Sequence, residues 1–370
     1  MVSKVKRVSV YLKAGRKAAT SYYRFYQHFD KIDAEFEYHL MIPDKRWDAF
    51  FPIAIQPLWK KVFIFFYIYL RVLWSLVKDV VRKPDSIVIS RCLINLVLPF
   101  SYKMLLKIVK RRGVKIIFDF DDQIIISREV SRYSFDYLTN ISDTVIVGST
   151  LLKELICPQD RGKVMFLPTT DGDIYDQVSE NIKIARLNAF ESEIKIVWVG
   201  TFSGLKYLRI ILEAIENFGE YLHSLSKRLT FFVVCDEPLD YHPQHFVLKN
   251  IKWNRQLAVN TMLNAHIGIM PLEDNAVTRG KCSFKLIQYL SAGLPCIGTN
   301  VGMNKIVLIN EVGIGLESNQ TDKWFNAFKK IVESKEKWLS YANNAIERWR
   351  NEFHSDTNLN KWRALLTIEE

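Results

Sequence analysis

A lysine and a glutamine lie three residues apart in residues 284–291, shortly before a short apolar run. The apolar residues of this stretch predict a helix with Lys285 and Gln288 on one adjoining face. Residues 292–295 contain a glycine and a proline that end the helix, and a buried strand follows. Ligands of open α/β sheets bind beyond such a strand end, so Lys285, Gln288 and Asn304 are predicted to converge on one crevice. Taken alone, the pattern also fits an ordinary surface helix.

A second candidate is the glycine-bearing turn at Gly200, which follows a predicted strand over residues 194–199. A strand-to-helix turn of this kind presents backbone N–H groups and the positive end of a helix dipole to an anion. Lys206 opens the next helix, where its ammonium group could neutralise a diphosphate. The alternative for Lys206 is a solvated helix position, and we favour the diphosphate.

Three carboxylates come at the end of a predicted strand over residues 114–118, namely Asp119, Asp121 and Asp122. Carboxylates at the end of a buried strand cost free energy unless each finds partners, so the cluster indicates a functional site. From the residues alone, a structural turn and a divalent metal held by paired carboxylates both stay open.

Together these stretches resemble the family 4 glycosyltransferases, which have the GT-B fold. One large branch of that family carries S-K-L-x-E-Y-M-A-x-G-x-P at its donor helix, and residues 283–295 read SFKLIQYLSAGLP. The same branch carries a stretch similar to the FDFDD of residues 118–122. The resemblance covers most of the chain and is strongest over residues 193–316. Gly280 and Gln288 stand where the family usually has two glutamates.

The resemblance implies a nucleotide-diphosphate sugar held mainly by the second domain. Lys206 matches the lysine of the family's V-G-R-x-x-x-x-K-G turn, whereas Thr201 occupies its arginine position. Lys281 or Lys285 would supply the second cation, and Gln288 would hydrogen-bond the ribose. The donor-binding residues implied in this way are Gly200, Thr201, Ser203, Lys206, Lys281, Lys285, Gln288, Gly302 and Asn304.

On the acceptor side, the resemblance implies that one of the three aspartates orients an acceptor hydroxyl or accepts its proton. We place this role ahead of a structural turn, and a metal site third. Gly15 and Arg24 are implied as acceptor-side contacts, although Arg24 equally fits a solvated helix residue. GT-B enzymes do not need a bound metal, so no metal and no cofactor besides the donor are expected. Lys206 and Lys285 would stabilise the charge of the departing diphosphate. The implied catalytic residues are therefore Asp119, Asp121, Asp122, Lys206 and Lys285.

The chain of 370 residues is longer than a domain with a single hydrophobic core usually is, so two domains are expected. The predicted fold class is α/β, a GT-B protein with two Rossmann-like domains facing an interdomain cleft. The predicted divisions are an N-terminal acceptor-side and membrane-facing domain at 1–176, a linker at 177–192, a nucleotide-sugar domain at 193–345 and a helix crossing back at 346–370.

The whole chain has a net charge of +11, and its positive charge is concentrated in the N-terminal third. Residues 1–118 hold 23 Lys and Arg against 8 Asp and Glu, a net charge of +15, so the remaining residues sum to −4. This asymmetry indicates that the N-terminal half faces something anionic, a membrane surface or a nucleic acid. The sequence has no RNA-binding, zinc or helix-turn-helix signature, so no nucleic-acid partner is expected.

Residues 57–83 predict an amphipathic helix, because their charges and aromatic rings separate onto two sides. The longest uncharged run, Val62–Leu70, is far shorter than the roughly 18–20 residues that span a bilayer. We therefore predict a helix lying on an anionic membrane surface. The alternative is that the aromatic side packs on the domain's own sheet. The polar side holds Lys60, Tyr67, Arg71, Lys78 and Arg82, and the apolar side holds Trp59, Phe63, Phe66, Leu70, Trp74 and Val77.

The sequence thus predicts a retaining, metal-independent hexosyl- or deoxyhexosyltransferase. It would move a sugar from a nucleotide-diphosphate sugar to a glycan or lipid-linked glycan in cell-surface polysaccharide synthesis. The alternative is a non-catalytic GT-B scaffold or partner subunit at the membrane, which the missing glutamates favour. Five scattered cysteines and the lack of a signal peptide indicate a cytoplasmic protein, peripheral on the inner face of the membrane. The sugar, the base, the acceptor and the oligomeric state stay open.

Overall fold

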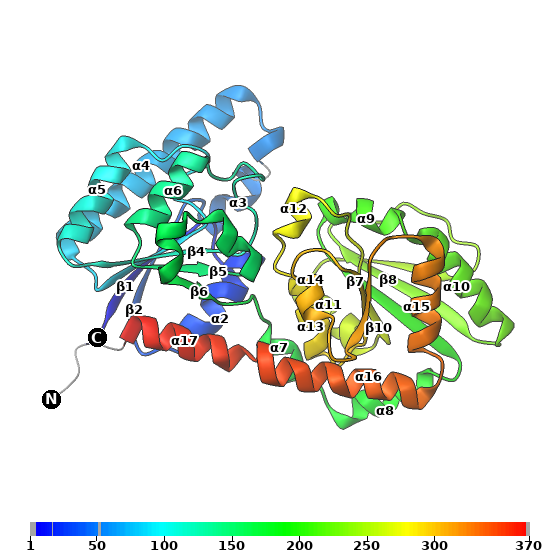
Figure 1. The fold of residues 1–370 in the computed structure, drawn as a ribbon. Coiled ribbons are helices and arrows are strands. Elements are labelled where there is room, and N and C mark those ends of the chain that lie inside the picture. Colours follow the sequence, from blue (N-terminus) through cyan, green and yellow to red (C-terminus); the bar gives the residue numbers. More distant parts are fainter. Residues whose placement is uncertain (1–4, 17, 51–52, 368–370) are drawn as a thin grey trace. The chain divides into compact units, whose positions relative to one another are not determined.

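The computed structural model describes residues 5–16, 18–50 and 53–367, which form two compact units (Figure 1). Unit 1 comprises the described residues up to Thr169 together with those from Ser355 onward, and unit 2 runs from Thr170 to His354. Each unit holds one six-stranded sheet in which all the neighbouring strands are parallel. The predicted α/β fold with two Rossmann-like domains is confirmed.

The sheet of unit 1 has the strand order β2-β1-β3-β4-β5-β6. The chain passes from β1 outward to β2 and then returns to the other side of β1, which places a topological switch point between β1 and β3. In such sheets, ligands bind beyond the carboxyl ends of the strands at this point. The strands are β1 (Arg7–Leu12), β2 (Glu35–Leu40), β3 (Ser86–Ser90), β4 (Lys115–Phe120), β5 (Thr144–Val147) and β6 (Val164–Phe166).

Helices cover both faces of this sheet, because alternate residues of its strands enter two separate apolar cores. Ile87 and Ile89 belong to the core beneath α4, α5 and α6, whereas Val88 faces α2 and α17. Trp362 of α17 is fully buried there, with its ring centroid 5.0 Å from that of Phe29. The helices are α1 (Ala19–Ser21), α2 (Gln27–Phe29), α3 (Asp44–Phe50), α4 (Leu58–Arg82), α5 (Phe100–Arg111), α6 (Arg132–Ile141) and α17 (Ser355–Thr367), with shorter helical turns at Tyr22–Tyr26, Ile53–Ile55, Thr150–Leu155 and Pro158–Lys163.

Helix α4 turns its aromatic side to solvent and packs an aliphatic side on the sheet. The buried side consists of Ile64, Ile68, Val72 and Leu76. The idea that the aromatic side packs on the sheet is therefore wrong. None of the described helices is both long and apolar enough to cross a bilayer. The aromatic face of α4, from 52% to 72% exposed, is formed by Trp59, Phe63, Phe66, Leu70 and Trp74.

The polar side of α4 is less available than predicted, because three of its cations bind groups of unit 1. Arg71 donates from Nε to the carbonyl of Leu40 at 2.7 Å, and Arg82 pairs with Glu37 at 3.1 Å. Lys78 also pairs with Glu37. These contacts fix the helix against β2.

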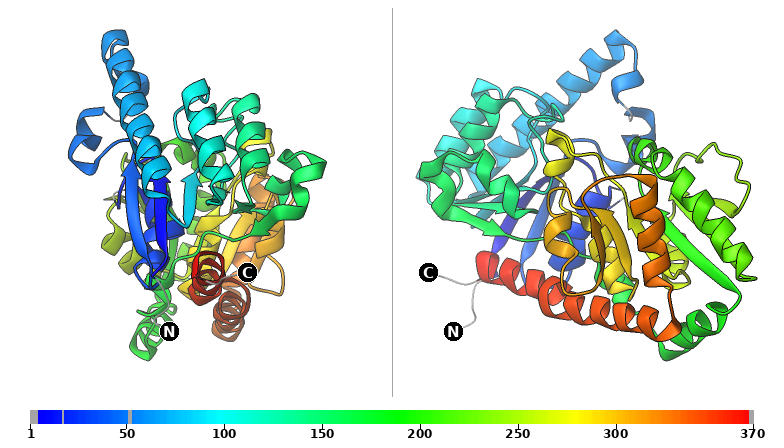
Figure 2. Two further views of the ribbon diagram at one scale, coloured as in Figure 1. Left: turned by 90° about the vertical axis from the view of Figure 1, so that its left-hand side faces the viewer. Right: turned by 45° about the vertical axis from the view of Figure 1, so that its right-hand side comes forward.

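The sheet of unit 2 has the strand order β12-β11-β10-β7-β8-β9, so its switch point lies between β7 and β10. Helices α10 and α15 pack side by side (Figure 2), with the rings of Phe218 and Phe328 stacked 5.1 Å apart. The strands are β7 (Glu193–Val199), β8 (Arg228–Cys235), β9 (Val247–Lys252), β10 (Ile267–Met270), β11 (Cys296–Thr299) and β12 (Gly313–Leu316). The helices are α7 (Gly172–Tyr175), α8 (Glu180–Ala189), α9 (Leu205–Arg209), α10 (Leu212–Ser224), α11 (Arg255–Leu263), α12 (Ala276–Arg279), α13 (Phe284–Ser291), α14 (Asn304–Val307), α15 (Thr321–Ile331) and α16 (Lys335–Arg348), with shorter turns at Phe202–Gly204 and Trp349–Phe353.

The segment 177–192, predicted as a linker, contains α8 and belongs to unit 2. Its anchor is Arg186, which is buried although the segment is mostly polar. The guanidinium donates to the carbonyls of Leu263 at 2.6 Å and Ala292 at 2.8 Å, at the ends of α11 and α13. Hydrogen bonds to helix ends thus dock this helix, which has no strong apolar periodicity to reveal it in the sequence.

Candidate functional site

The turn after β7 is shaped by an indole ring that lies beneath it. Trp198 is buried, and a Cβ added to Gly200 would lie 2.4 Å from its ring. A Cβ on Gly204 would lie 2.7 Å from the same ring. Both glycines are therefore required, because any side chain would displace the ring from under the turn.

The same turn leaves backbone donors open at the switch point of unit 2. Within the described chain, no acceptor is assigned to the N–H groups of Thr201, Phe202 and Ser203. The hydroxyl groups of Thr201 and Ser203 lie 3.1 Å apart and are exposed. Consecutive N–H groups in a tight turn form a concavity that suits an anion. Gly200, Thr201 and Ser203, which were predicted to contact the donor, lie in this turn, and their role in binding stays a prediction.

Lys285 lies against this turn because a buried tyrosine anchors its helix. The Tyr289 hydroxyl accepts the N–H of Val199, the last residue of β7, at 3.1 Å. Lys285 is one helical turn before Tyr289, and its Cε would lie 2.9 Å from a Cβ on Gly200. Its Nζ is 5.8 Å from the Trp198 ring centroid. Sequence reasoning missed Tyr289, although the spacing of four residues from Lys285 places both on one side of α13.

The other two predicted donor lysines differ from Lys285 in their surroundings. Lys206 is exposed on α9, and its Nζ lies 4.9 Å from the ring centroid of Tyr207. Lys281 is half-buried between α12 and α13, and its backbone N–H bonds the carbonyl of Thr278 at 3.1 Å. Lys285 is thus the lysine that the structure places directly against the Gly200 turn.

Gln288, predicted to bind ribose, uses its amide inside unit 2. The side chain is buried, and Nε2 donates to Asp171 Oδ2 at 2.8 Å. The other oxygen of Asp171 caps α7 by accepting the N–H of Asp173 at 3.1 Å. In this structure Gln288 joins α13 to α7.

Asn304 likewise uses its side chain for structure, whereas the loop before it offers backbone donors. Asn304 is buried, accepts the Ser283 hydroxyl at 2.6 Å and donates to the carbonyl of Thr299 at 2.9 Å. Gly302 has φ +56°, and a Cβ there would lie 2.5 Å from the carbonyl oxygen of Arg279. In the described chain no acceptor is assigned to the N–H groups of Gly302 and Met303. These donors, beyond the end of β11, fit the main-chain contact predicted for this loop.

In unit 1, the first aspartate of the acidic cluster lies inside β4 and forms a buried ion pair. Asp119 is fully buried, and Arg24 donates to it in a fork, with Nε 2.8 Å from Oδ2. The same guanidinium donates to the Leu167 carbonyl at 3.1 Å and to the Thr169 hydroxyl at 2.9 Å. Burial raises the pKa of Asp119, which the attraction of Arg24 opposes. The alternative of a solvated Arg24 is wrong.

The other two aspartates share a second arginine. Arg91, in the left-handed conformation at φ 62°, donates to Asp121 Oδ1 from Nη2 at 2.7 Å and also to Asp122. It pairs with Glu129 at 2.7 Å as well. Burial favours a raised pKa at Asp121, but Arg91 and Arg24 outweigh it and hold that pKa below its ordinary value.

Asp122 is the most exposed carboxylate of the cluster, with 41% of its side chain accessible. Sequence reasoning did not foresee Arg91 as the partner of the cluster. The signal available was its position at the end of β3, which pairs in parallel with β4. Asp119, Asp121 and Asp122 are thus held by two arginines.

Gly15 lies in the turn after β1 and contacts the first residue of α3. Its N–H donates to Asp44 Oδ1 at 3.2 Å, and a Cβ would lie 2.3 Å from the same carboxylate. The Ser21 hydroxyl donates to the carbonyl of Ala14, seven residues earlier in the chain, at 2.7 Å and so closes this turn.

Comparison with known proteins gives one family match and a consistent fold. Residues 193–334, less than half of the chain, match the family described as glycosyl transferases group 1. The matched segment contains the Gly200 turn, Lys285 and the loop at Gly302. No curated protein sequence matches the chain.

Several solved structures are similar over nearly the whole chain. HepE from Anabaena in complex with UDP has 11% identity and a TM-score of 0.61, with 97% of this chain and 99% of that one covered. A UDP-forming trehalose-phosphate synthase from Burkholderia xenovorans, in complex with glucose-6-phosphate, gives the same values. A putative UDP-N-acetylglucosamine 2-epimerase from Listeria monocytogenes has 11% identity and a TM-score of 0.58, over 97% and 95% of the chains. At such identities the likeness concerns the fold, and the GT-B prediction is confirmed.

Proposed function

We propose that this protein is a glycosyltransferase that takes a sugar from a nucleotide-diphosphate sugar. The observation that carries the proposal is the contact of Lys285 with Gly200 inside the segment that matches glycosyl transferases group 1. A lysine, a glycine turn and open N–H groups at a switch point are the groups that a diphosphate needs. The finer proposal is a retaining, metal-independent family 4 hexosyl- or deoxyhexosyltransferase, which the donor-helix resemblance supports.

In this proposal the diphosphate lies over the turn after β7. The N–H groups of Thr201 and Ser203 donate to its oxygens, and Lys285 neutralises the charge that gathers as the anomeric bond breaks. Lys206 and Lys281 add positive charge from the two sides of the turn. The Gly302 loop supplies further main-chain donors. The contribution of Gln288 is indirect, because its amide holds Asp171.

Acceptor positioning belongs to the acidic cluster of unit 1, and we assign it to Asp122. Its carboxylate is the most accessible of the three, so it could accept a hydrogen bond from a sugar hydroxyl. Asp119 and Asp121 act through the arginines that keep the cluster in place. Gly15 and Arg24 are positioning residues in this account, since both are buried and satisfied by unit 1.

We further propose that the protein works at the inner face of a membrane, with a lipid-linked glycan acceptor, in cell-surface polysaccharide synthesis. The aromatic face of α4 supports this, because exposed Trp and Phe on one helix side favour the membrane interface. Lys60, Lys61 and the basic N-terminal third supply attraction to anionic lipids.

The proposal is tested by titrating the full-length protein with UDP-, GDP-, dTDP- and CMP-sugars in a calorimeter. The nucleotide sugars of one of the four bases are expected to bind at micromolar to millimolar concentration. Slow hydrolysis of the bound nucleotide sugar is expected to release the nucleotide. No binding by any of them contradicts a donor site in unit 2. Binding without hydrolysis or transfer, in the presence of a membrane extract, favours the scaffold reading that Gly280 and Gln288 support.

Membrane association is tested by sedimentation with vesicles of phosphatidylcholine, with and without phosphatidylglycerol. The protein is expected to bind the anionic vesicles, and Trp59→Ser with Trp74→Ser is expected to release it. Trp59 and Trp74 are each 72% exposed, so the double variant keeps its fold. Equal binding of the variant and the wild-type protein would contradict a role for the aromatic face.

A further inference from the structure

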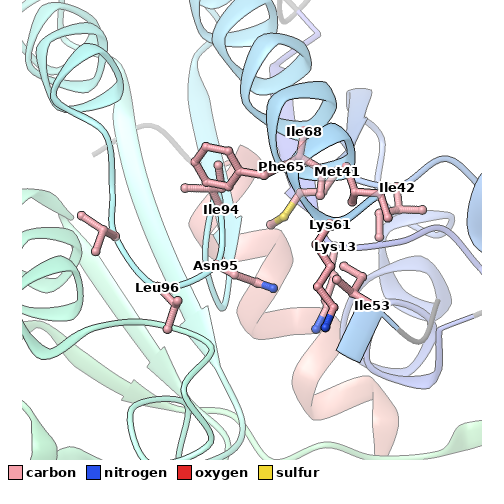
Figure 3. Close-up of a pocket in the computed structure, with 12 residues that line it drawn as sticks. Lys13, Met41, Ile42, Ile53, Lys61, Phe65, Ile68, Ile94, Asn95 and Leu96 are labelled. Atoms are coloured by element: carbon pink, nitrogen blue, oxygen red, sulfur yellow. The ribbon is translucent and has the colours of Figure 1, made fainter. Parts of the chain in front are cut away.

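A pocket of about 340 Å³ opens in unit 1 beside α4 (Figure 3). It lies beyond the ends of three neighbouring strands: Lys13 follows β1, Met41 follows β2, and Asn95 belongs to the loop after β3. Because these strands are parallel, their carboxyl ends meet at one edge of the sheet. The pocket therefore occupies the switch point of unit 1, the place where open α/β sheets bind ligands. Its volume falls in the range of small-molecule sites.

The walls of this pocket are apolar, and its cations lie together at one end. Ile64 and Ile68 of α4 form its floor with Ile94, and all three are buried. Figure 3 shows the side chains of Lys13 and Lys61 running alongside one another, with their ammonium groups at the same end of the pocket. An apolar pocket with positive charge at one end is complementary to a hydrocarbon chain that carries a phosphate.

Neither ammonium group is strongly engaged by the protein. The Nζ of Lys13 lies 3.8 Å from Glu129 Oε2, which is beyond hydrogen-bonding distance. Lys61 has no ion-pair partner among the residues that the structure describes. Three pocket residues, Phe65, Leu96 and Val97, are between 45% and 60% exposed, so the pocket leaves apolar surface in water that a chain would cover.

Leu96 is held at the pocket in a conformation that leucine seldom adopts. Its φ is +67°, and its backbone is fixed by hydrogen bonds with Glu129 and Ser131 at 2.9 Å and 2.7 Å. A left-handed leucine costs free energy of the order of 1 kcal/mol or more, which asparagine and glycine largely avoid. The strain keeps an exposed apolar side chain on the pocket wall.

We propose that this pocket binds the hydrocarbon segment next to the phosphate of a lipid-linked acceptor, with the phosphate held by Lys13 and Lys61. The identification of the ligand as an acceptor rests on the proposed glycosyl transfer. The affinity of the pocket for a chain that ends in a phosphate does not rest on glycosyl transfer, because it follows from the residues that line the pocket.

The test is a titration of the full-length protein with monomeric hexyl, octyl and decyl phosphate, in the absence of any nucleotide sugar. The affinity is expected to rise by about fourfold for each added methylene until the chain outgrows the pocket. Decanol and inorganic phosphate, which each lack one half of the ligand, are expected to bind at least about tenfold more weakly than decyl phosphate. Equal binding of decanol and decyl phosphate, or no dependence on chain length, overturns the proposal.

Three variants locate the binding. Lys61→Gln is expected to weaken the binding of decyl phosphate by about five- to tenfold. The control Lys323→Gln, which changes an exposed lysine of α15 in unit 2, leaves the affinity unchanged. Leu96→Asn is expected to lower the affinity for decyl phosphate by about tenfold, because the pocket loses an apolar side chain. The thermal stability of the protein should not fall, because asparagine tolerates the left-handed backbone. A structural role for Leu96 predicts the reverse, a lower melting temperature and unchanged affinity.

Two further ligands separate the sources of the phosphate. Farnesyl phosphate is expected to bind more tightly than dihexanoyl phosphatidylglycerol, whose phosphodiester carries one charge and two chains. Equal binding of the two would identify the site as one for membrane phospholipid and overturn the acceptor assignment. A failed nucleotide-sugar panel leaves these titrations intact, so the two proposals fail separately.

Discussion

The strand ends of β4 in unit 1 and β7 in unit 2 both carry the charged residues that the sequence marked for chemistry, but they differ in how those groups are satisfied. After β4, Arg24 and Arg91 bind the carboxylates of Asp119, Asp121 and Asp122. After β7, the N–H groups of Thr201, Phe202 and Ser203 have no assigned acceptor in the described chain, and Lys285 lies against the same turn. One end is closed by its own side chains and the other is open to an anion.

This difference separates two reasons for finding charges at a strand end. A buried carboxylate needs a charged or hydrogen-bonding partner wherever it lies, because desolvation of the charge costs free energy. A paired carboxylate at a strand end is therefore not by itself a sign of a binding site. Backbone donors left without acceptors are costly unless water or a ligand reaches them. Residues 201–203 are exposed, so water or an anion can reach their donors, whereas the closed cluster is a framework that leaves Asp122 accessible.

The largest effect is expected from breaking the closed cluster. Arg24→Met leaves Asp119 buried without its cation, so the free energy of unfolding of unit 1 is expected to fall by about 3–5 kcal/mol in denaturant titrations. Adding Asp119→Leu removes the unpaired charge and is expected to restore most of that loss. If the double variant also regains sugar transfer, Asp119 is structural. If it is stable and inactive, Asp119 takes part in the reaction and the contrast between the two strand ends fails.

Removing the cation of the open turn is expected to change activity and not stability. Lys285→Ala should lower donor hydrolysis or transfer by about 10²–10³-fold, the usual cost of one preorganised charge-stabilising group. Its melting temperature should match that of the wild-type protein, because Lys285 is only half-buried. The matched control is Lys252→Ala, an exposed lysine at the end of β9. Equal effects of the two variants on activity would remove Lys285 from the donor site.

A smaller effect, dependent on pH, is expected from placing a glutamate at position 288 of α13. Gln288→Glu places a second carboxylate beside Asp171, which Gln288 contacts at 2.8 Å in a buried site. Like charges raise the pKa of the pair above the values of the unfolded chain. The variant should therefore be nearly as stable as the wild-type protein near pH 4, and should lose about 1–3 kcal/mol as the pH rises through the raised pKa.

The control for this prediction is the double variant Gln288→Glu with Asp171→Asn. Asparagine still accepts the N–H of Asp173 and can donate to the new carboxylate, so the pH-dependent loss should disappear. A loss of stability in Gln288→Glu that is the same at every pH would show that Asp171 is not the cause.

Periodicity and turn residues were enough to predict the sheets and most of the elements that hold the site. The helix at 284–291 and the strand at 296–299 were predicted at the bounds that the structure has, because apolar spacing and a glycine-proline stop determine both locally. The same local reasoning predicted the turn at Gly200, whereas the family resemblance suggested Lys281 or Lys285 as its second cation. Local reasoning failed for the segment 177–192, where one buried arginine, not an apolar face, docks α8.

What the sequence determined by itself was which residues lie at the carboxyl ends of the strands, since alternation and turn chemistry are properties of short stretches of chain. Only the tertiary structure decided which of those residues are satisfied. Arg24 lies 95 residues before Asp119, and Gln288 lies 117 residues after Asp171. Hydrogen bonds at such separations depend on how whole strands and helices pack, and no local pattern in the chain encodes them.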